Sequence, residues 1–261
     1  LTEIGKKVVE QAKTIVNESN RLSDIVDQQK GFIGGDFRIG IIPTITPTLL
    51  PMFLKTFLKK YTKVNLIVEE LTTQEIIKKL IDGHLDAAIA ATPLEDENIK
   101  EKILYYEPFV NFIPEHHRLY NKQKIDPSEL NLNDILLLRD GHCFKDSIIN
   151  LCNITSQNNK PGFQFQSGNF ETLIKLSKEN MGMTLLPYLT TFDLNDGDKK
   201  YLREFTTPIP AREVSIIHHK SQLKMQLIEA LKTTIDGVVR GAIAFHDVKI
   251  ISPIQKAKGV Y

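Results

Sequence analysis

The stretch FRIGIIPTITPTLLPMFLKTFLKKYTKVNLIVEELTTQEIIKKLIDGHLDAAIAA, residues 37–91, alternates short apolar runs with amphipathic segments. Three of the runs have the length and composition of buried strands: residues 37–42, 64–71 and 85–91. Two segments between them place apolar residues at helical spacing: residues 46–61 and 72–83. This βαβαβ order predicts a parallel sheet with helices on its faces.

The strand, helix and strand order recurs between residues 106 and 187, which indicates a second α/β unit. A further strand at residues 213–219 and a helix over about 223–239 follow it. In such units, ligands bind at the carboxyl ends of strands and at helix N-termini, so two units predict a cleft between them. The predicted fold class is therefore α/β, with two Rossmann-like subdomains.

A long amphipathic helix is predicted ahead of this fold. Residues 1–29 place apolar side chains at steps of three and four, or their multiples, and contain no proline. Such a stripe packs either on its own domain or on a partner helix, and the periodicity alone leaves both alternatives open. The glycines of GFIGGD, residues 31–36, then end the helix.

The bulk composition excludes some function classes. The chain has 33 basic and 32 acidic residues, so its net charge indicates neither nucleic-acid nor membrane-surface binding. No apolar run is long enough to span a bilayer, and we expect a fragment of a soluble, cytoplasmic protein. In a reducing compartment its two cysteines are expected to be thiols, so that any disulfide between them is conditional.

Both cysteines lie in one short segment, DGHCFKDSIINLC, residues 140–152. A thiolate, rather than a thiol, attacks peroxide, so a sensing cysteine needs a depressed pKa and access to the oxidant. Cys143 is expected near a helix N-terminus with His142, Lys145 and Arg139 as nearby positive charges, which predicts a depressed pKa. Cys152 follows an apolar run and is expected to be a buried neutral thiol.

The spacing of the two thiols predicts a conformational switch. If residues 143–152 are helical, nine steps of about 1.5 Å separate the two Cα atoms by roughly 13 Å, on opposite faces of the helix. A disulfide needs Cα atoms within about 7 Å, so the helix must unwind for the bond to form. On this interpretation Cys143 senses the oxidant and Cys152 resolves the sulfenic acid. The alternative is that both are ordinary small core residues.

Several segments resemble the LysR-type transcriptional regulators. LTEIGKKVVEQAK is similar to the linker helix of that family, and three further segments are similar to parts of its effector domain: GDFRIGIIPTITPTLLPMFLKTFLKKY, LIDGHLDAAIA and ENMGMTLLP. The resemblance covers about residues 1–240 and implies a type 2 periplasmic-binding-protein fold. It divides the chain into a linker or dimerisation helix at 1–30, regulatory subdomain I at 31–107 and 212–245, subdomain II with the redox switch at 108–211, and a tail at 246–261.

Within that family, DGHC followed by a second cysteine nine positions on resembles the OxyR group of hydrogen peroxide sensors. The resemblance implies a transcription activator, not an enzyme, that is oxidised by hydrogen peroxide and needs no cofactor. It implies a homodimer or homotetramer that binds DNA through an N-terminal domain absent from this sequence. Its further partners would be RNA polymerase and a thiol reductant system.

The resemblance also implies supporting residues at the site. Thr44 and Thr73, with His142, match positions that hold peroxide or water beside the thiol, and Asp146 matches a further position of the motif. From the residues alone, Thr46 before Pro47 is expected to cap a helix, and either Thr72 or Thr73 caps the next one. One departure is visible: where the group has an arginine after the late strand, this chain has His218, His219 and Lys220, which puts a fixed positive charge in doubt.

Other kinds of site find little support in the sequence. The adjacent histidine pairs, 116–117 and 218–219, do not have metal-ligand spacing with cysteines or carboxylates, and no nucleotide-binding glycine pattern is present. Three alternative functions remain: a LysR-type regulator that binds a small metabolite in the cleft, a thiol peroxidase, and a secreted solute-binding protein. The long apolar-striped helix argues against the last of these.

Overall fold

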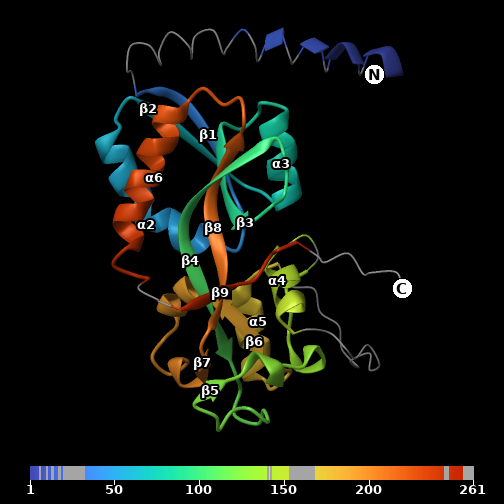
Figure 1. Ribbon diagram of the computed structural model, residues 1–261, viewed down its shortest axis with the longest axis vertical. Helices are drawn as coiled ribbons and strands as arrows, with labels where there is room; N and C mark the ends of the chain where they lie inside the picture. Colours follow the sequence, from blue (N-terminus) through green and yellow to red (C-terminus); the bar gives the residue numbers. More distant parts are fainter. Residues whose placement is uncertain are drawn as a thin grey trace.

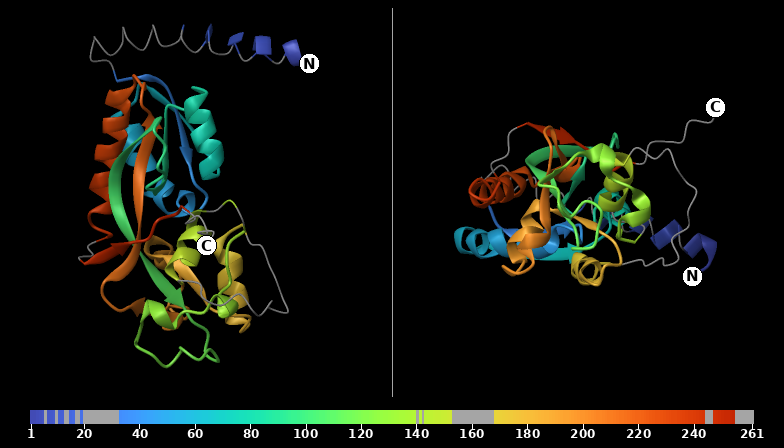
Figure 2. Two further views of the ribbon diagram at one scale, coloured as in Figure 1. Left: turned by 45° about the vertical axis from the view of Figure 1, so that its right-hand side comes forward. Right: turned by 90° about the horizontal axis from the view of Figure 1, so that it is seen from below.

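Two lobes joined by a pair of long strands make up the body of the protein (Figure 1). The structure is a computed structural model, and it describes residues 1–5, 7–9, 11–12, 15–16, 19, 33–139, 141, 143–152, 168–243 and 247–254. The described residues between 3 and 19 are helical and lie across one end of the first lobe (Figures 1 and 2). Residues 20–32 of the predicted N-terminal helix lie outside the described residues.

The first lobe has the βαβαβ order that the sequence predicts. Its elements are β1 (Gly35–Ile41), α2 (Thr46–Lys60), β2 (Val64–Glu70), α3 (Thr73–Ile81) and β3 (Ala87–Thr92). Strand β1 pairs in parallel with both β2 and β3, which confirms the parallel sheet. Every residue of β3 is buried, as expected for a central strand covered on both faces.

Two long antiparallel strands run from the first lobe into the second. They are β4 (Ile99–Phe112) and β8 (Ile209–His219), and β8 also pairs with β3, so the strand order is β2-β1-β3-β8-β4-β7-β5. The sequence predicted only the second half of β4, because its first half, IKEKILY, alternates in polarity less clearly than the buried half. Strand β8 returns the chain to the first lobe, where helix α6 (Met225–Val239) packs beside α2 (Figure 1).

The second lobe contains shorter elements around its own core. Its strands and helices are β5 (Lys124–Ile125), α4 (Cys143–Leu151), α5 (Phe170–Lys178), β6 (Thr184–Pro187) and β7 (Leu202–Phe205). Four 3-10 turns connect them: η1 (Pro127–Glu129), η2 (Leu132–Asp134), η3 (Tyr188–Asp193) and η4 (Lys199–Tyr201). Among its described residues, the segment at 134–140 forms only an isolated bridge, between Ile135 and Met183. The part of this lobe at 153–167 lies outside the described residues.

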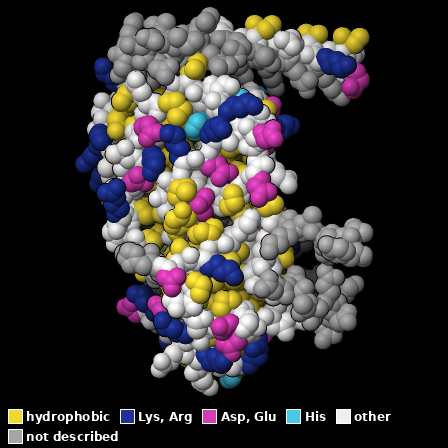
Figure 3. All heavy atoms as spheres, in the orientation of Figure 1, with side chains coloured by type: hydrophobic (Ala, Val, Ile, Leu, Met, Phe, Trp, Pro, Cys, Tyr) yellow, Lys and Arg dark blue, Asp and Glu magenta, His cyan; other side chains and the backbone are white. Residues whose placement is uncertain are grey.

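The two lobes have separate hydrophobic cores. One contains Phe37, Phe53 and Phe57, and the other contains Phe109 and Phe205. The last described element is β9 (Val248–Ile250), a short strand parallel to β8 that the sequence did not predict. On the face in Figure 3, acidic and basic side chains are interspersed over both lobes. Within the described residues, no helix is both long and apolar enough to cross a membrane.

Substitution of Gly40 tests the packing of β1 against α3. A Cβ atom at this position would lie 2.9 Å from Leu85 Cδ1 and 3.1 Å from Ile76 Cγ1. We expect Gly40→Ala to lower the free energy of unfolding by about 1–3 kcal/mol, as overpacking does. Urea denaturation measures this change in the free energy of unfolding.

The matched control is Gly237→Ala in α6, where a Cβ would meet nothing within 4 Å. Because alanine favours a helix over glycine by roughly 0.5–1 kcal/mol, this variant should be more stable than the wild type. Equal loss of stability in both variants would contradict the close approach of α3 to β1.

Candidate functional site

Cys143 lies at the first turn of α4, at the junction of the two lobes. Gly141, with φ +88, turns the chain into the helix, a backbone conformation that glycine adopts without strain. The side chain of Cys143 is 7% exposed and belongs to the core of the first lobe, whereas Phe144 and Ile148 belong to the core of the second. Helix α4 is therefore anchored in both cores, and the thiol is its contact with the first.

A buried arginine provides fixed positive charge at this junction. Arg212, in β8, is 1% exposed, and its Nε and Nη2 donate to Glu107 Oε2 at 2.9 and 2.7 Å. Its Nη1 donates to Thr44 Oγ1 at 2.9 Å, and its Nη2 also reaches the carbonyl oxygen of Thr44 at 3.1 Å. The guanidinium lies 5.4 Å from the ring centre of Phe144, the neighbour of Cys143.

Glu107 holds the arginine from the other side. Its Oε1 accepts a hydrogen bond from the backbone N–H of Leu189 in η3 at 2.9 Å, and its side chain is 1% exposed. A buried ion pair is stable only when its hydrogen-bonding capacity is met, and here every oxygen of the carboxylate has a donor. Arg212 is thus fixed in orientation, with Thr44 as its contact toward the cleft.

The two threonines that open α3 have different roles. The hydroxyl of Thr72 accepts a hydrogen bond from the backbone N–H of Glu75 at 3.4 Å, and the Glu75 carboxylate accepts one from the backbone N–H of Thr72 at 2.9 Å. This is a capping box, so Thr72 is the cap. The Thr73 hydroxyl takes no part in the cap; it is buried without a hydrogen-bond partner among the described residues, and it lowers the pKa of the Cys143 thiol.

Burial raises the pKa of Cys143 above its ordinary value. The Arg212 charge, the Thr73 hydroxyl and a backbone contact with Ala91 act in the opposite direction, while Asp146 raises the pKa further. The predicted low pKa and open access of Cys143 are therefore wrong for this conformation. Desolvation in the core of the first lobe outweighs the groups that favour the thiolate.

Cys152 lies just beyond the C-terminal end of α4. Its backbone N–H donates to the carbonyl of Ile148 at 3.0 Å, its side chain is partly buried, and both cysteines are free thiols. Burial and the nearby Asp134 carboxylate raise its pKa to about 12, so the thiol is neutral. Helix α4 covers residues 143–151, so the two Cα atoms are separated by nine helical steps, roughly 13 Å.

The structure brings together Thr44, Thr73 and Cys143, three of the predicted site residues, around Arg212. His142 lies outside the described residues, so its predicted role stays a prediction. Asp146 lies half-buried on α4, where its charge opposes formation of the Cys143 thiolate.

Two expectations at this site need correction. Fixed positive charge is present, but it comes from Arg212 inside β8 rather than from a residue after the strand. His218 and His219 lie at the C-terminal end of β8, where they pair with Lys100 and Ile99 of β4. A charged residue within the apolar stretch IPAREVSII was the available signal. Thr46 is not a cap, because Ile45 occupies the cap position and the Thr46 hydroxyl donates to the Ile42 carbonyl at 3.1 Å.

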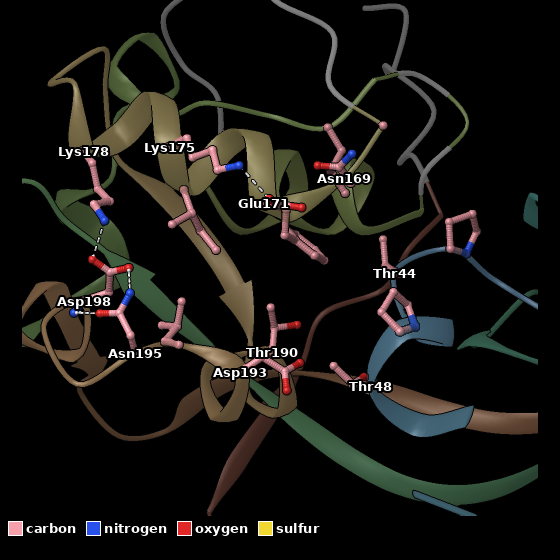
Figure 4. A pocket seen from close by; sticks show the side chains of 17 residues that line it. Thr44, Thr48, Asn169, Glu171, Lys175, Lys178, Thr190, Asp193, Asn195 and Asp198 are labelled. Atoms are coloured by element: carbon pink, nitrogen blue, oxygen red, sulfur yellow. Dashed lines mark hydrogen bonds and ion pairs between the residues drawn. The ribbon is translucent and has the colours of Figure 1, made fainter. Parts of the chain in front are cut away.

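A cleft of about 650 Å³ opens beside the arginine, between the lobes (Figure 4). Thr44 and Thr48 line it from the first lobe, and α5 and η3 line it from the second. Its second-lobe wall carries both signs of charge, including Glu171 paired with Lys175 at 2.6 Å and Lys178 paired with Asp198 at 2.7 Å. Among the described residues, no group of three or more histidine, cysteine or acidic side chains could hold a metal ion.

Comparisons with known proteins agree on one family. The model of the LysR substrate binding domain matches residues 30–239. The chain is 27% identical to the hydrogen peroxide-inducible genes activator of Haemophilus influenzae, over 93% of this chain and 80% of that protein. It is 29% identical to the DNA-binding transcriptional dual regulator OxyR of Escherichia coli, over 90% of this chain and 78% of that protein. The crystal structure of OxyR from Porphyromonas gingivalis superposes with a TM-score of 0.76 and 27% identity, over 83% of this chain and 99% of that one.

Removal of the Arg212 charge should make the Cys143 thiol less reactive at a given pH. Because the guanidinium lowers the pKa of Cys143, Arg212→Gln should move the rate–pH profile of thiol modification to higher pH. In both proteins the rate should rise with pH, since the thiolate is the reacting form. The measurement is modification by a small thiosulfonate between about pH 6 and 10 in a Cys152→Ser background. Superimposable profiles in proteins of equal circular dichroism would show that the guanidinium does not act on the thiol.

The adjacent threonines offer a matched pair of substitutions. Thr73→Val should shift the same profile to higher pH with little loss of stability, because the hydroxyl lowers the pKa of the Cys143 thiol and does not cap the helix. Thr72→Val should lower the free energy of unfolding by about 1 kcal/mol, as loss of a cap does, and leave the profile in place. Thermal unfolding and the modification rate separate the two effects. Interchanged outcomes would contradict the assignment of the cap to Thr72.

Proposed function

The chain belongs to the family of LysR-type transcriptional regulators, as a regulatory region with a mixed α/β fold and not an enzyme, and we propose that it senses hydrogen peroxide. The observation that carries the proposal is the placement of Cys143. It lies at the start of a helix that ends beside the second thiol, with Arg212, Thr44 and Thr73 around it. The relatives named for peroxide-inducible activation support this function over binding of a metabolite.

The reaction proceeds in two balanced steps. The Cys143 thiolate attacks one oxygen of hydrogen peroxide, the O–O bond breaks, and the products are a sulfenic acid and hydroxide. The Cys152 thiol then attacks the sulfenic sulfur, which forms the disulfide and releases water. The Thr44 and Thr73 hydroxyls, with His142, hold peroxide beside the sulfur, and the positive charge of Arg212 stabilises both the thiolate and the departing oxygen.

The raised pKa of Cys143 restrains the reaction rather than preventing it. Only the thiolate form of Cys143 reacts, and burial keeps the thiolate fraction low. A small oxidant must therefore reach the sulfur and the polar groups around it, which favour the thiolate. The thiol is buried in the core of the first lobe, which limits the access of larger oxidants. Asp146, which opposes the thiolate, contributes to the same restraint.

Disulfide formation then forces a change of fold. The two Cα atoms must approach from roughly 13 Å to within about 7 Å, so α4 unwinds and Cys143 leaves the core of the first lobe. The division between regulatory subdomains that we propose, residues 31–107 with 212–245 against 108–211, passes through the paired residues Glu107 and Arg212. The refolding therefore acts at the junction that sets how the lobes are joined.

The remaining partners follow from the family and are part of the proposal. We place the protein in the cytoplasm, as a homodimer or homotetramer that binds DNA through a separate N-terminal domain and acts on RNA polymerase. The apolar residues Ile4, Val8 and Ile15 are 76%, 61% and 62% exposed, which suits a helix that pairs with a second copy. A thiol reductant system returns the disulfide to the reduced form, and the sensor itself reacts once per cycle.

A second candidate function rests on the cleft. Its volume of about 650 Å³ and its mixture of apolar and charged walls suit a small polar metabolite. In that case the thiols would be ordinary core residues, and ligand binding would not depend on their oxidation state.

The test is intact mass and peptide mapping after brief exposure to near-stoichiometric hydrogen peroxide. We expect loss of two hydrogen atoms, mapped to a bond between Cys143 and Cys152 and reversed by a thiol reductant. Cys152→Ser should accumulate the sulfenic acid at Cys143, which a dimedone adduct identifies, because no resolving thiol is present.

Cys143→Ser serves as the control, in which Cys152 should remain reduced because its pKa of about 12 leaves almost no thiolate. Two unchanged thiols in the wild type would overturn the peroxide proposal. Saturable binding of a metabolite with equal affinity before and after peroxide treatment would then favour the second candidate.

A further inference from the structure

Residues 247–254 form a strap that crosses from β8 to α4. Strand β9 within the strap pairs in parallel with the start of β8, so that Ile250 lies opposite Ala211, the neighbour of Arg212. The ladder is extended by hydrogen bonds from Ile209 N to Asp247 O at 3.1 Å and from Ile251 N to Ala211 O at 2.8 Å. In Figure 1 the strap is the red segment that passes from β9 toward α4.

The far end of the strap is fastened to α4 between the two cysteines. Asn150 Nδ2 donates to the carbonyl oxygens of Ser252 and Ile254 at 2.9 and 2.8 Å, which uses both of its amide hydrogens. Ile251 is 7% exposed and belongs to the same core as Ile148 and Leu151 of α4. The strap therefore contacts α4 through one polar clamp and one apolar anchor.

Both contacts depend on the helical form of α4. Ile148 and Leu151 share one face of the helix at i,i+3 spacing, and both residues, with Asn150, lie inside the segment that a disulfide between Cys143 and Cys152 would unwind. Unwinding removes the Asn150 amide from the two carbonyls and the apolar partners from Ile251. The strap thus distinguishes the two forms of the switch segment by contacts that exist in one form alone.

We propose that residues 247–254 are a redox-linked latch, which binds helical α4, stabilises the dithiol form and is released from α4 when the disulfide forms. The proposal rests on the peroxide-sensing function above and adds the element that sets its threshold. Because the linkage is reciprocal, a latch that stabilises the helix makes the disulfide harder to form, and the disulfide loosens the latch. The latch also connects the switch to β8 next to Arg212, the strand that joins the lobes.

The decisive variant is Asn150→Ala in the full chain. Alanine favours a helix more than asparagine does, so local propensity alone would stabilise α4 and oppose oxidation. The latch predicts the reverse: loss of two hydrogen bonds should shift the thiol–disulfide equilibrium roughly tenfold toward the disulfide, a potential about 30 mV more negative. The measurement is the fraction oxidised in graded glutathione buffers, read by thiol alkylation and mass.

Two truncations form a matched pair that differs by three residues. Removal of 252–261 deletes both carbonyl acceptors and should shift the equilibrium as Asn150→Ala does, whereas removal of 255–261 leaves them and should have no effect. Because Asn150 and the strap end form one interaction, Asn150→Ala combined with removal of 252–261 should add nothing to either change alone. If the two changes shifted the equilibrium by the sum of their separate effects, the hydrogen bonds between Asn150 and the strap would not be the interaction that both changes remove.

Hydrogen exchange of the dithiol protein tests the latch separately from the redox chemistry. Asn150→Ala should speed exchange of the α4 amides, and oxidation of the wild type should speed exchange at 247–254. Unchanged α4 exchange in Asn150→Ala overturns the latch whether or not the disulfide forms. A wild type that forms no disulfide overturns the sensing function instead, and faster exchange without a shift of the equilibrium overturns their linkage.

Discussion

The buried ion pair between Arg212 and Glu107 is the interaction on which the rest of the structure depends. The two residues lie opposite each other on β8 and β4, at the point where the long strands pass from one lobe to the other. From there the pair reaches Thr44 in the first lobe and the Leu189 N–H in the second. Loss of either partner would leave a buried charge uncompensated, at a cost of about 3–5 kcal/mol. A single charge pair therefore fixes the junction and the polarity of the thiol site.

Desolvation and local charge compete at Cys143. Burial in the core of the first lobe favours the neutral thiol, while Arg212 and Thr73 favour the thiolate. The outcome is a thiol with a raised pKa beside groups that stabilise negative charge.

The helix that carries Cys143 is held by contacts on several sides. The thiol packs in the first core, Phe144 and Ile148 pack in the second, and Asn150 is clamped by the strap. Each contact stabilises the helical form of α4. Packing in two cores and the hydrogen bonds of Asn150 therefore act together on this one helix.

The sequence by itself determined the local structure. Apolar periodicity determined the βαβαβ unit, the boundaries of α2, α3 and α6 to within a few residues, and the helix between the cysteines. These features depend on neighbouring residues, which is why a pattern reveals them. The separation of roughly 13 Å between the two cysteine Cα atoms likewise follows from nine residues of helix geometry.

The tertiary structure decided what depends on residues distant in the chain. The pairing of Arg212 with Glu107, 105 positions away, turned a charge in an apolar strand into the central group of the site. Burial in the core of the first lobe raised the pKa of Cys143, which its neighbours in sequence had indicated to be low. The short strand β9 carries too weak a pattern to predict, because its pairing with β8 and its fastening to Asn150 arise from contacts between segments far apart in the chain.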